Sequence, residues 1–192
     1  MEKERNNLYP IFLKVKELEV LIVGGGYVAE EKLTFLLKSS PNAKVTMVAP
    51  LFREGTVVAA KKGNVEIIND VYNSSYLKGK HIVIATTDKP EINVEVYHDC
   101  KKESKLVNVA DNPPYCDFYM GGIVTKGNVK VAISTNGKSP TTAKRLRQFF
   151  EETIPEDINQ LVQNLNSYRK TIKGNFEKKV ETLNKLTESL VK

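Results

Sequence analysis

The stretch VLIVGGGYVAEEK, residues 20–32, decides the fold of this chain. The preceding apolar run, Leu18 to Val23, ends abruptly at three glycines, as a buried parallel strand does where it meets a tight turn. Apolar residues then recur at helical spacing as far as the breaker Ser39-Ser40-Pro41, and residues 45–49 return to a strand-like composition. The sequence therefore predicts a strand, a helix and a second strand.

The glycines fit the pattern GxGxxA, which holds the pyrophosphate of a dinucleotide when it joins a strand to a helix. Gly24 is expected to form the tight turn, Gly26 to let the pyrophosphate approach beside Gly25, and Ala29 to pack the helix against the strand. Backbone amides and the positive helix end then meet at one point that favours phosphate. The alternative is a turn that only connects two elements, but its setting favours a nicotinamide cofactor and a redox reaction.

Strands and helices continue to alternate up to a fifth strand at residues 106–110, which predicts an α/β, Rossmann-like parallel sheet with helices on both faces. The pattern then changes to a β-hairpin, with strands at 118–125 and 129–134, and a helix that opens at Ser139-Pro140. Long amphipathic helices follow from residue 158 and are divided or bent near Gly174. We expect a Rossmann domain at 1–113, a hairpin region at 114–143 and a helical domain at 144–192.

Composition limits the partners. The net charge of +6 suits an anionic partner, but the lysines are spread along the chain, so neither nucleic acid nor a membrane is expected, and a small polyanionic substrate satisfies the same charge. No apolar run approaches the length of a membrane span, and the first residues lack a secretory signal. Cys100 and Cys116 are expected to be reduced thiols in a cytoplasmic protein, and no spacing of metal ligands is present.

The choice of cofactor is open at this stage. The fingerprint usually adds an acidic residue about 20 positions after the glycines to hold the ribose, but the second strand runs into Pro50 and Leu51. Arg53 could accept the 2′-phosphate of NADP, although an ordinary exposed arginine is the favoured interpretation. Thr86, Thr87 and Asp88 follow the fourth strand and are candidate nicotinamide contacts, with turn formation as their alternative.

Asp111 follows the fifth strand and therefore lies at the same edge of the sheet as the glycine turn. A carboxylate there could act as a general base, bind a metal or position a proton during hydride transfer. From spacing alone, an Asx-type turn before Pro113 is the favoured interpretation.

Several stretches resemble one family. Five stretches are similar to the dehydrogenase/chelatase module of siroheme synthase: YPIFLKV, VLIVGGGYVAEEK, IATTD, NVADNP and FYMGGIVTKGNVKVAISTNGKSPTTAKRLR. We expect a stand-alone form of this module without the methyltransferase domain. The resemblance implies NAD-dependent oxidation of precorrin-2 to sirohydrochlorin, with insertion of ferrous iron in some members. It also implies Asp111 as the catalytic aspartate, NAD contacts at Tyr27, Val28, Pro50 and Leu51, and a homodimer formed through the hairpin.

The implied substrate is a tetrapyrrole with eight carboxylates, which requires cations or helix amides around it. The helix that opens at Ser139 could receive an anion, and Lys144 and Arg145 lie on it, although a solvated helix face explains them equally well. Thr135 stands where the resemblance places a residue bordering the active site. An alternative of another class is a regulatory domain that binds NAD without turnover, and a generic small dehydrogenase is a further alternative.

Overall fold

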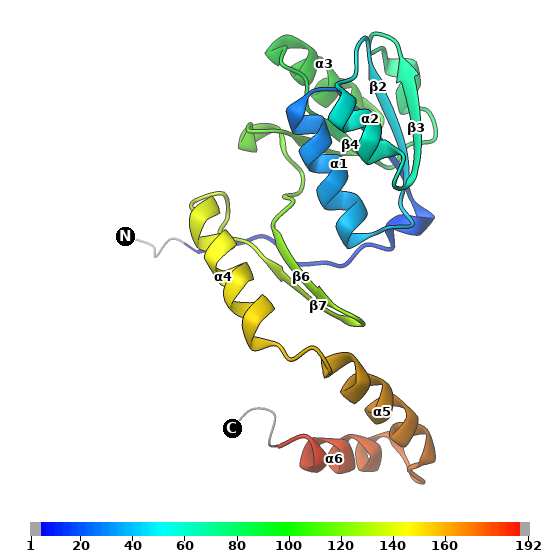
Figure 1. Ribbon diagram of the computed structural model, residues 1–192, viewed down its shortest axis with the longest axis vertical. Coiled ribbons are helices and arrows are strands. Elements are labelled where there is room, and N and C mark those ends of the chain that lie inside the picture. The colour runs from blue at the N-terminus through cyan, green and yellow to red at the C-terminus, as the bar shows by residue number, and fades with distance from the viewer. Residues whose placement is uncertain (1–4, 189–192) are drawn as a thin grey trace. The chain divides into compact units, whose positions relative to one another are not determined.

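The computed structural model describes residues 5–188. Residues 1–4 of the predicted Rossmann domain and residues 189–192 of the predicted helical domain lie outside the described residues. The chain forms two compact units, of which unit 1 ends at Met120 and unit 2 begins at Gly121 (Figure 1). Unit 1 holds the parallel sheet, and unit 2 holds the hairpin and the three C-terminal helices. Each unit is described by itself.

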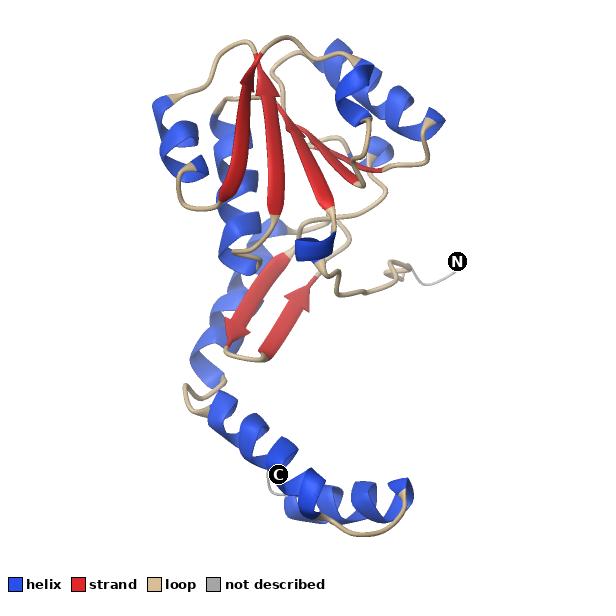
Figure 2. Ribbon diagram, turned by 90° about the vertical axis from the view of Figure 1, so that its right-hand side faces the viewer, coloured by secondary structure: helices blue, strands red, loops and turns tan. Residues whose placement is uncertain are grey.

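Unit 1 is built on a five-stranded sheet in which every neighbouring pair is parallel. The order of the strands is β3-β2-β1-β4-β5, and helices lie on both sides of the sheet (Figure 2). The strands are β1 (Glu19–Val23), β2 (Lys44–Ala49), β3 (Asn64–Asn69), β4 (Ile82–Ala85) and β5 (Leu106–Val109). The predicted Rossmann-like sheet is confirmed.

Three helices of unit 1 cover the sheet: α1 (Tyr27–Ser39), α2 (Glu54–Ala60) and α3 (Pro90–Lys102). Alternate residues of each strand point to opposite faces, so β1 supplies Val20 and Ile22 to one core and Leu21 and Val23 to the other. The first core includes buried residues of α1 and α2, and the second includes those of α3. Continuous apolar strands are therefore required, as the sequence of β1 shows.

The strand order fixes where a ligand can bind. The chain runs from β1 outward to β3 and then returns to β4 on the other side of β1, so the direction of winding reverses between β1 and β4. In open α/β sheets the crevice beyond the carboxyl ends of the strands at this switch point is where ligands bind. The glycine turn follows β1, and Thr86 follows β4, so both stand at the switch point.

Residues 114–120 belong to unit 1, whereas the predicted boundary stood at residue 113. Phe118 and Met120 pack against the core of the sheet, and the amide of Asp117 donates to the carbonyl oxygen of Val107 over 2.8 Å. The hairpin strand predicted from residue 118 therefore begins later, at Gly122. Apolar side chains at 118 and 120 fit a strand pattern equally well, which is why the sequence misplaced the start.

Unit 2 consists of an antiparallel hairpin followed by helices, as predicted. Its elements are β6 (Gly122–Lys126), β7 (Val129–Ile133), α4 (Pro140–Thr153), α5 (Ile158–Thr171) and α6 (Phe176–Leu186). Gly174 adopts φ of 119°, in the left-handed region, and so separates α5 from α6. None of the described residues forms a helix long and apolar enough to span a membrane.

Candidate dinucleotide-binding and catalytic site

The three glycines of the turn differ in the space that surrounds them. Gly24 adopts φ of 128°, and a Cβ atom there would lie 2.5 Å from Oγ1 of Thr86. A Cβ atom on Gly25 would lie 2.2 Å from the carbonyl oxygen of Leu51. In contrast, a Cβ atom on Gly26 would meet no heavy atom within 4 Å. Packing therefore requires Gly24 and Gly25, whereas the open space beside Gly26 suits a ligand that approaches the backbone.

A pocket of about 670 Å³ lies at the switch point, entirely within unit 1. Its lining includes every predicted cofactor residue except Ala29, which is fully buried against the sheet: Gly24, Gly25, Gly26, Tyr27, Val28, Pro50, Leu51, Thr86, Thr87 and Asp88. The sequence did not indicate the further lining residues Val71, Tyr72, Lys89 and Ile92. Tyr27 and Leu51 are mostly exposed, which gives the pocket an apolar rim suited to a flat aromatic ligand.

The residues that follow β4 form a tightly bonded turn. The hydroxyl of Thr86 donates to the carbonyl oxygen of Val23 over 2.8 Å. The amide of Thr87 donates to Oδ1 of Asn93, whose Nδ2 donates back to the carbonyl oxygen of Thr87. These bonds are those of the turn-forming alternative, and they fix the backbone where it lines the pocket. Asp88 is exposed.

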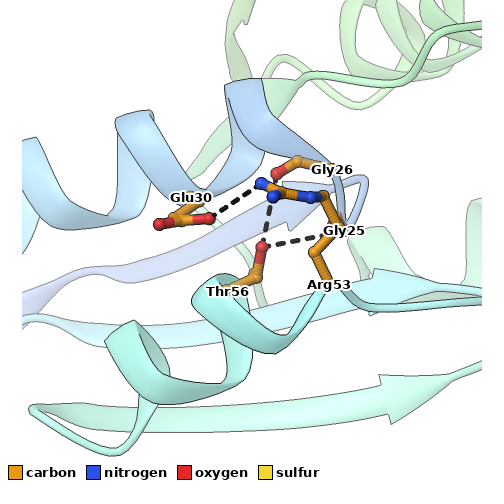
Figure 3. A network of polar contacts seen from close by, with 5 residues as sticks. All are labelled: Gly25, Gly26, Glu30, Arg53 and Thr56. Atoms are coloured by element: carbon orange, nitrogen blue, oxygen red, sulfur yellow. Dashed lines mark hydrogen bonds and ion pairs between the residues drawn. The ribbon is translucent and has the colours of Figure 1, made fainter.

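Arg53 is held in place by the glycine turn, and its interpretation as an ordinary exposed arginine is wrong. Its amide donates to the carbonyl oxygen of Gly25, and its guanidinium donates to Glu30 over 3.2 Å (Figure 3). The guanidinium carbon lies 3.0 Å from the centre of the Tyr27 ring. A cation over an aromatic face is attracted by the ring quadrupole. The sequence carried no signal for this network, because Glu30 and Arg53 lie on different elements.

Asp111 stands in a turn held by side chains. Its φ is 57°, a left-handed conformation that aspartate tolerates better than most residues, and the amide of Asn112 donates to the carbonyl oxygen of Val109. The Cys116 thiol lies 3.2 and 3.3 Å from the carbonyl oxygens of these same two residues, which bracket Asp111. The side chain is exposed and is not among the lining of the pocket. A turn is present before Pro113, but it is closed by the backbone bond from Asn112 to Val109, and among the described residues the Asp111 carboxylate forms no hydrogen bond of the kind that an Asx-type turn requires.

A buried asparagine completes this turn. Nδ2 of Asn108 donates to the carbonyl oxygen of Phe118 over 2.8 Å and lies 3.4 Å from the Cys116 sulfur. Burial raises the pKa of the Cys116 thiol, which therefore keeps its proton at neutral pH and can donate it to a carbonyl oxygen. Asn108 and Cys116 were not predicted as part of the site, because side-chain bonds within a loop leave no periodic pattern in the sequence.

The predicted substrate residues all lie in unit 2. Oγ1 of Thr135 lies within hydrogen-bond distance of the backbone of Ser139, and the Ser139 hydroxyl accepts from the amide of Thr142, as the predicted N-cap of α4. Lys144 and Arg145 are exposed on α4. These four residues are therefore close in the chain and share one end of α4.

Two thiols and two histidines do not combine into a metal site. The described residues contain no group of three or more histidine, cysteine, aspartate or glutamate side chains that could hold a metal ion. Both cysteines are free thiols. Nδ1 of His81 accepts from the amide of Glu19, which gives that histidine a structural partner at the start of β1.

Comparison with known proteins identifies the family. Residues 11–122 match the sequence model of a family described as NAD(P)-binding, which covers more than half of the chain. This chain belongs to that NAD(P)-binding family. Residues 126–153 match a second model, described as the central part of the sirohaem biosynthesis protein. The NAD(P)-binding match spans the whole pocket, and the second match begins at the last residue of β6 and spans β7 and α4.

Curated relatives extend the similarity. The siroheme synthase of Pseudoalteromonas atlantica is 38% identical over 88% of this chain, and that of Nitrosococcus oceani is 38% identical over 85%. The chain spans 36% and 35% of the length of these two relatives. The precorrin-2 dehydrogenase SirC has the same fold, with a TM-score of 0.72 at 24% identity over 93% of this chain and 89% of SirC. The resemblance to the siroheme synthase module is confirmed.

Proposed function

We propose that this protein is a precorrin-2 dehydrogenase, which oxidises precorrin-2 to sirohydrochlorin with NAD in siroheme biosynthesis. One observation carries the proposal: a chain that is similar to siroheme synthases over most of its length has a dinucleotide pocket at the switch point of its sheet. The free thiols and the absence of a spanning helix among residues 5–188 support a cytoplasmic location.

The residues of the pocket fit a dinucleotide. The space beside Gly26 and the first amides of α1 suit a pyrophosphate, and the exposed faces of Tyr27 and Leu51 suit its flat bases. When bound, NAD supplies a hydride acceptor. The turn after β4 holds Thr87 and Asp88 in the lining of the pocket, at the edge where the nicotinamide of a Rossmann enzyme lies.

In the proposal, Asp111 is the catalytic residue. Loss of a hydride from a ring carbon must be coupled to loss of a proton, and an exposed carboxylate at the carboxyl edge of β5 can accept that proton or position the ring. The left-handed turn presents this carboxylate outside the sheet. The resemblance to the siroheme synthase module also implies insertion of ferrous iron in some members. There the same carboxylate would receive the pyrrole protons, so chelation stays a prediction that depends on Asp111 as well.

Thr135, Ser139, Lys144 and Arg145 are the proposed contacts for the carboxylates of the macrocycle, and the hairpin is the proposed dimer interface. Lys144 and Arg145 are adjacent exposed cations near the start of α4, where they can pair with carboxylates. Replacing both with glutamine should raise KM for precorrin-2 and leave the affinity for NADH unchanged. Light scattering at micromolar protein concentration tests the homodimer.

The decisive experiment mixes the protein with precorrin-2 and NAD, follows the absorbance of the macrocycle and of NADH, and then adds ferrous iron. The parent protein should form NADH only when precorrin-2 is present. Asp111→Asn keeps the left-handed turn, since asparagine tolerates it, and should lower turnover by at least about a hundredfold at unchanged NADH affinity. A folded Asp111→Asn variant with the parental rate would remove the role of Asp111. NADH binding without turnover by the parent would favour the regulatory alternative.

A further inference from the structure

The carboxyl end of β2 lacks the group that usually selects NAD. Rossmann sites specific for NAD place a carboxylate there to hold the ribose hydroxyls, whereas an arginine nearby accommodates the 2′-phosphate of NADP. This chain has Pro50 and Leu51 at that position, with Arg53 two residues further along the wall of the pocket. Taken alone, these residues favour the phosphorylated nucleotide.

Glu30 changes the charge that Arg53 offers. Its carboxylate comes from the first turn of α1 and accepts a hydrogen bond from Nη1 of Arg53 over 3.2 Å (Figure 3). About a third of each of the two side chains is exposed, so the pair is screened only in part. The ring of Tyr27 lies against the guanidinium and limits its movement.

Two residues of α2, Thr56 and Gly55, lie beside the Glu30–Arg53 pair and the glycine turn. The hydroxyl of buried Thr56 lies 3.0 Å from the carbonyl oxygen of Gly25 and 3.3 Å from that of Gly26, which ties α2 to the glycine turn. A Cβ atom on Gly55 would lie 2.4 Å from Oε2 of Glu30. A residue with a side chain at position 55 would therefore displace the carboxylate of Glu30.

We propose that Glu30 is the residue that makes this site prefer NAD to NADP, and that it acts through Arg53. The inference rests on the proposed use of a nicotinamide dinucleotide in this pocket. The carboxylate neutralises the guanidinium and repels a second anion beside it, so a 2′-phosphate gains little from Arg53. Helix α1 thus supplies the negative charge that other NAD sites place at the end of the second strand.

The test measures dissociation constants for NADH and NADPH by nicotinamide fluorescence, with no macrocycle present. The variants are Glu30→Gln, Arg53→Gln and the double substitution. The matched control is Glu31→Gln, which removes the same charge from the neighbouring residue of α1, where the carboxylate pairs with Lys32 and is mostly exposed. Thermal melting checks that each variant is folded.

Glu30→Gln should tighten NADPH binding about tenfold and change NADH binding by less than about threefold, because a freed guanidinium forms charge-assisted bonds with phosphate. Glu31→Gln should change neither constant, and the gain should disappear in the double variant. An equal effect of the two glutamate substitutions, or a gain that persists without Arg53, would overturn the inference. A parent protein that binds neither nucleotide would overturn the proposed function as well. A parent protein that binds NADH without oxidising precorrin-2 would overturn only the proposed function.

Discussion

Two turns at the carboxyl edge of the same sheet carry the proposed chemistry, and they are built in opposite ways. The glycine turn after β1 is shaped by the absence of side chains, since Cβ atoms on Gly24 and Gly25 would collide with neighbouring atoms. The Asp111 turn after β5 is shaped by side chains, with Asn108 and Cys116 bonded to backbone carbonyl groups around it. The first turn therefore requires residues without side chains, and the second requires the side chains of Asn108 and Cys116.

This difference decides what each turn tolerates. In the glycine turn any added atom at two positions meets a backbone carbonyl or a buried hydroxyl, and neither can move without disturbing β2 or β4. In the Asp111 turn the loss of a donor leaves a carbonyl group without its partner, which costs about 1–3 kcal/mol when that group is buried. We expect substitutions at Gly24 and Gly25 to unfold the first turn, and substitutions at Asn108 and Cys116 only to loosen the second.

The largest effect is expected for Gly24→Val. The substitution combines a left-handed φ with a contact of 2.5 Å to Thr86, so the free energy of unfolding should fall by about 3 kcal/mol or more. Gly79→Ala is the control, because Gly79 also has a left-handed φ, of 74°, but has no atom within 4 Å of the added Cβ. That control should cost only about 1 kcal/mol in urea denaturation. Equal losses for the two variants would show that crowding at Thr86 is unimportant.

Asn108→Ala should have an intermediate effect. The carbonyl group of Phe118 loses its side-chain donor, so stability should fall by about 2 kcal/mol. Because the turn around Asp111 loosens, turnover should fall about tenfold while NADH affinity stays within about twofold of the parent. Asn69→Ala removes an exposed asparagine from β3 and should change neither quantity. A parental rate in the Asn108→Ala variant would show that the buried asparagine does not position Asp111.

Cys116→Ala should have a smaller effect, because a thiol is a weak donor. We expect a loss of about 1 kcal/mol and a two- to fivefold lower turnover. Cys116→Ser restores a donor at the same place and should recover most of the turnover, which a role in packing alone would not predict. If alanine and serine give the same turnover, the thiol does not hold the turn.

The smallest effect at neutral pH concerns the other thiol, Cys100, which is fully buried on α3. Burial raises its pKa to about 12, whereas the pKa of a cysteine in an unfolded chain is about 8.5. Between these values the unfolded chain loses a proton that the folded chain keeps, so this thiol makes stability fall as pH rises, by up to about 1.4 kcal/mol per pH unit. Urea denaturation at pH 7 and pH 10 should show a smaller loss for Cys100→Ala than for the parent. Equal losses would contradict the burial.

The same contrast explains how far the sequence could be interpreted. Positions that accept only glycine leave a recognisable pattern in the sequence. The strand before them is apolar because both faces of the sheet are covered. The sheet, the glycine turn and the N-cap at Ser139 were therefore predictable, whereas Val71, Tyr72, Lys89 and Ile92 of the pocket lining were not. The bonds from Asn108 and Cys116, and the pair between Glu30 and Arg53, join residues whose spacing follows no period. Only the three-dimensional structure shows that such residues lie in contact.

One measurement tests the central claim most directly, namely that the glycine turn holds a dinucleotide. Gly26→Val places a side chain where no atom lies within 4 Å of its Cβ, and φ of −86° suits any residue, so stability should change by no more than about 1 kcal/mol. Titration with NADH should nevertheless show affinity at least about tenfold weaker than in the parent, because the side chain fills the space of the pyrophosphate. A stable Gly26→Val protein that binds NADH as tightly as the parent would contradict the account.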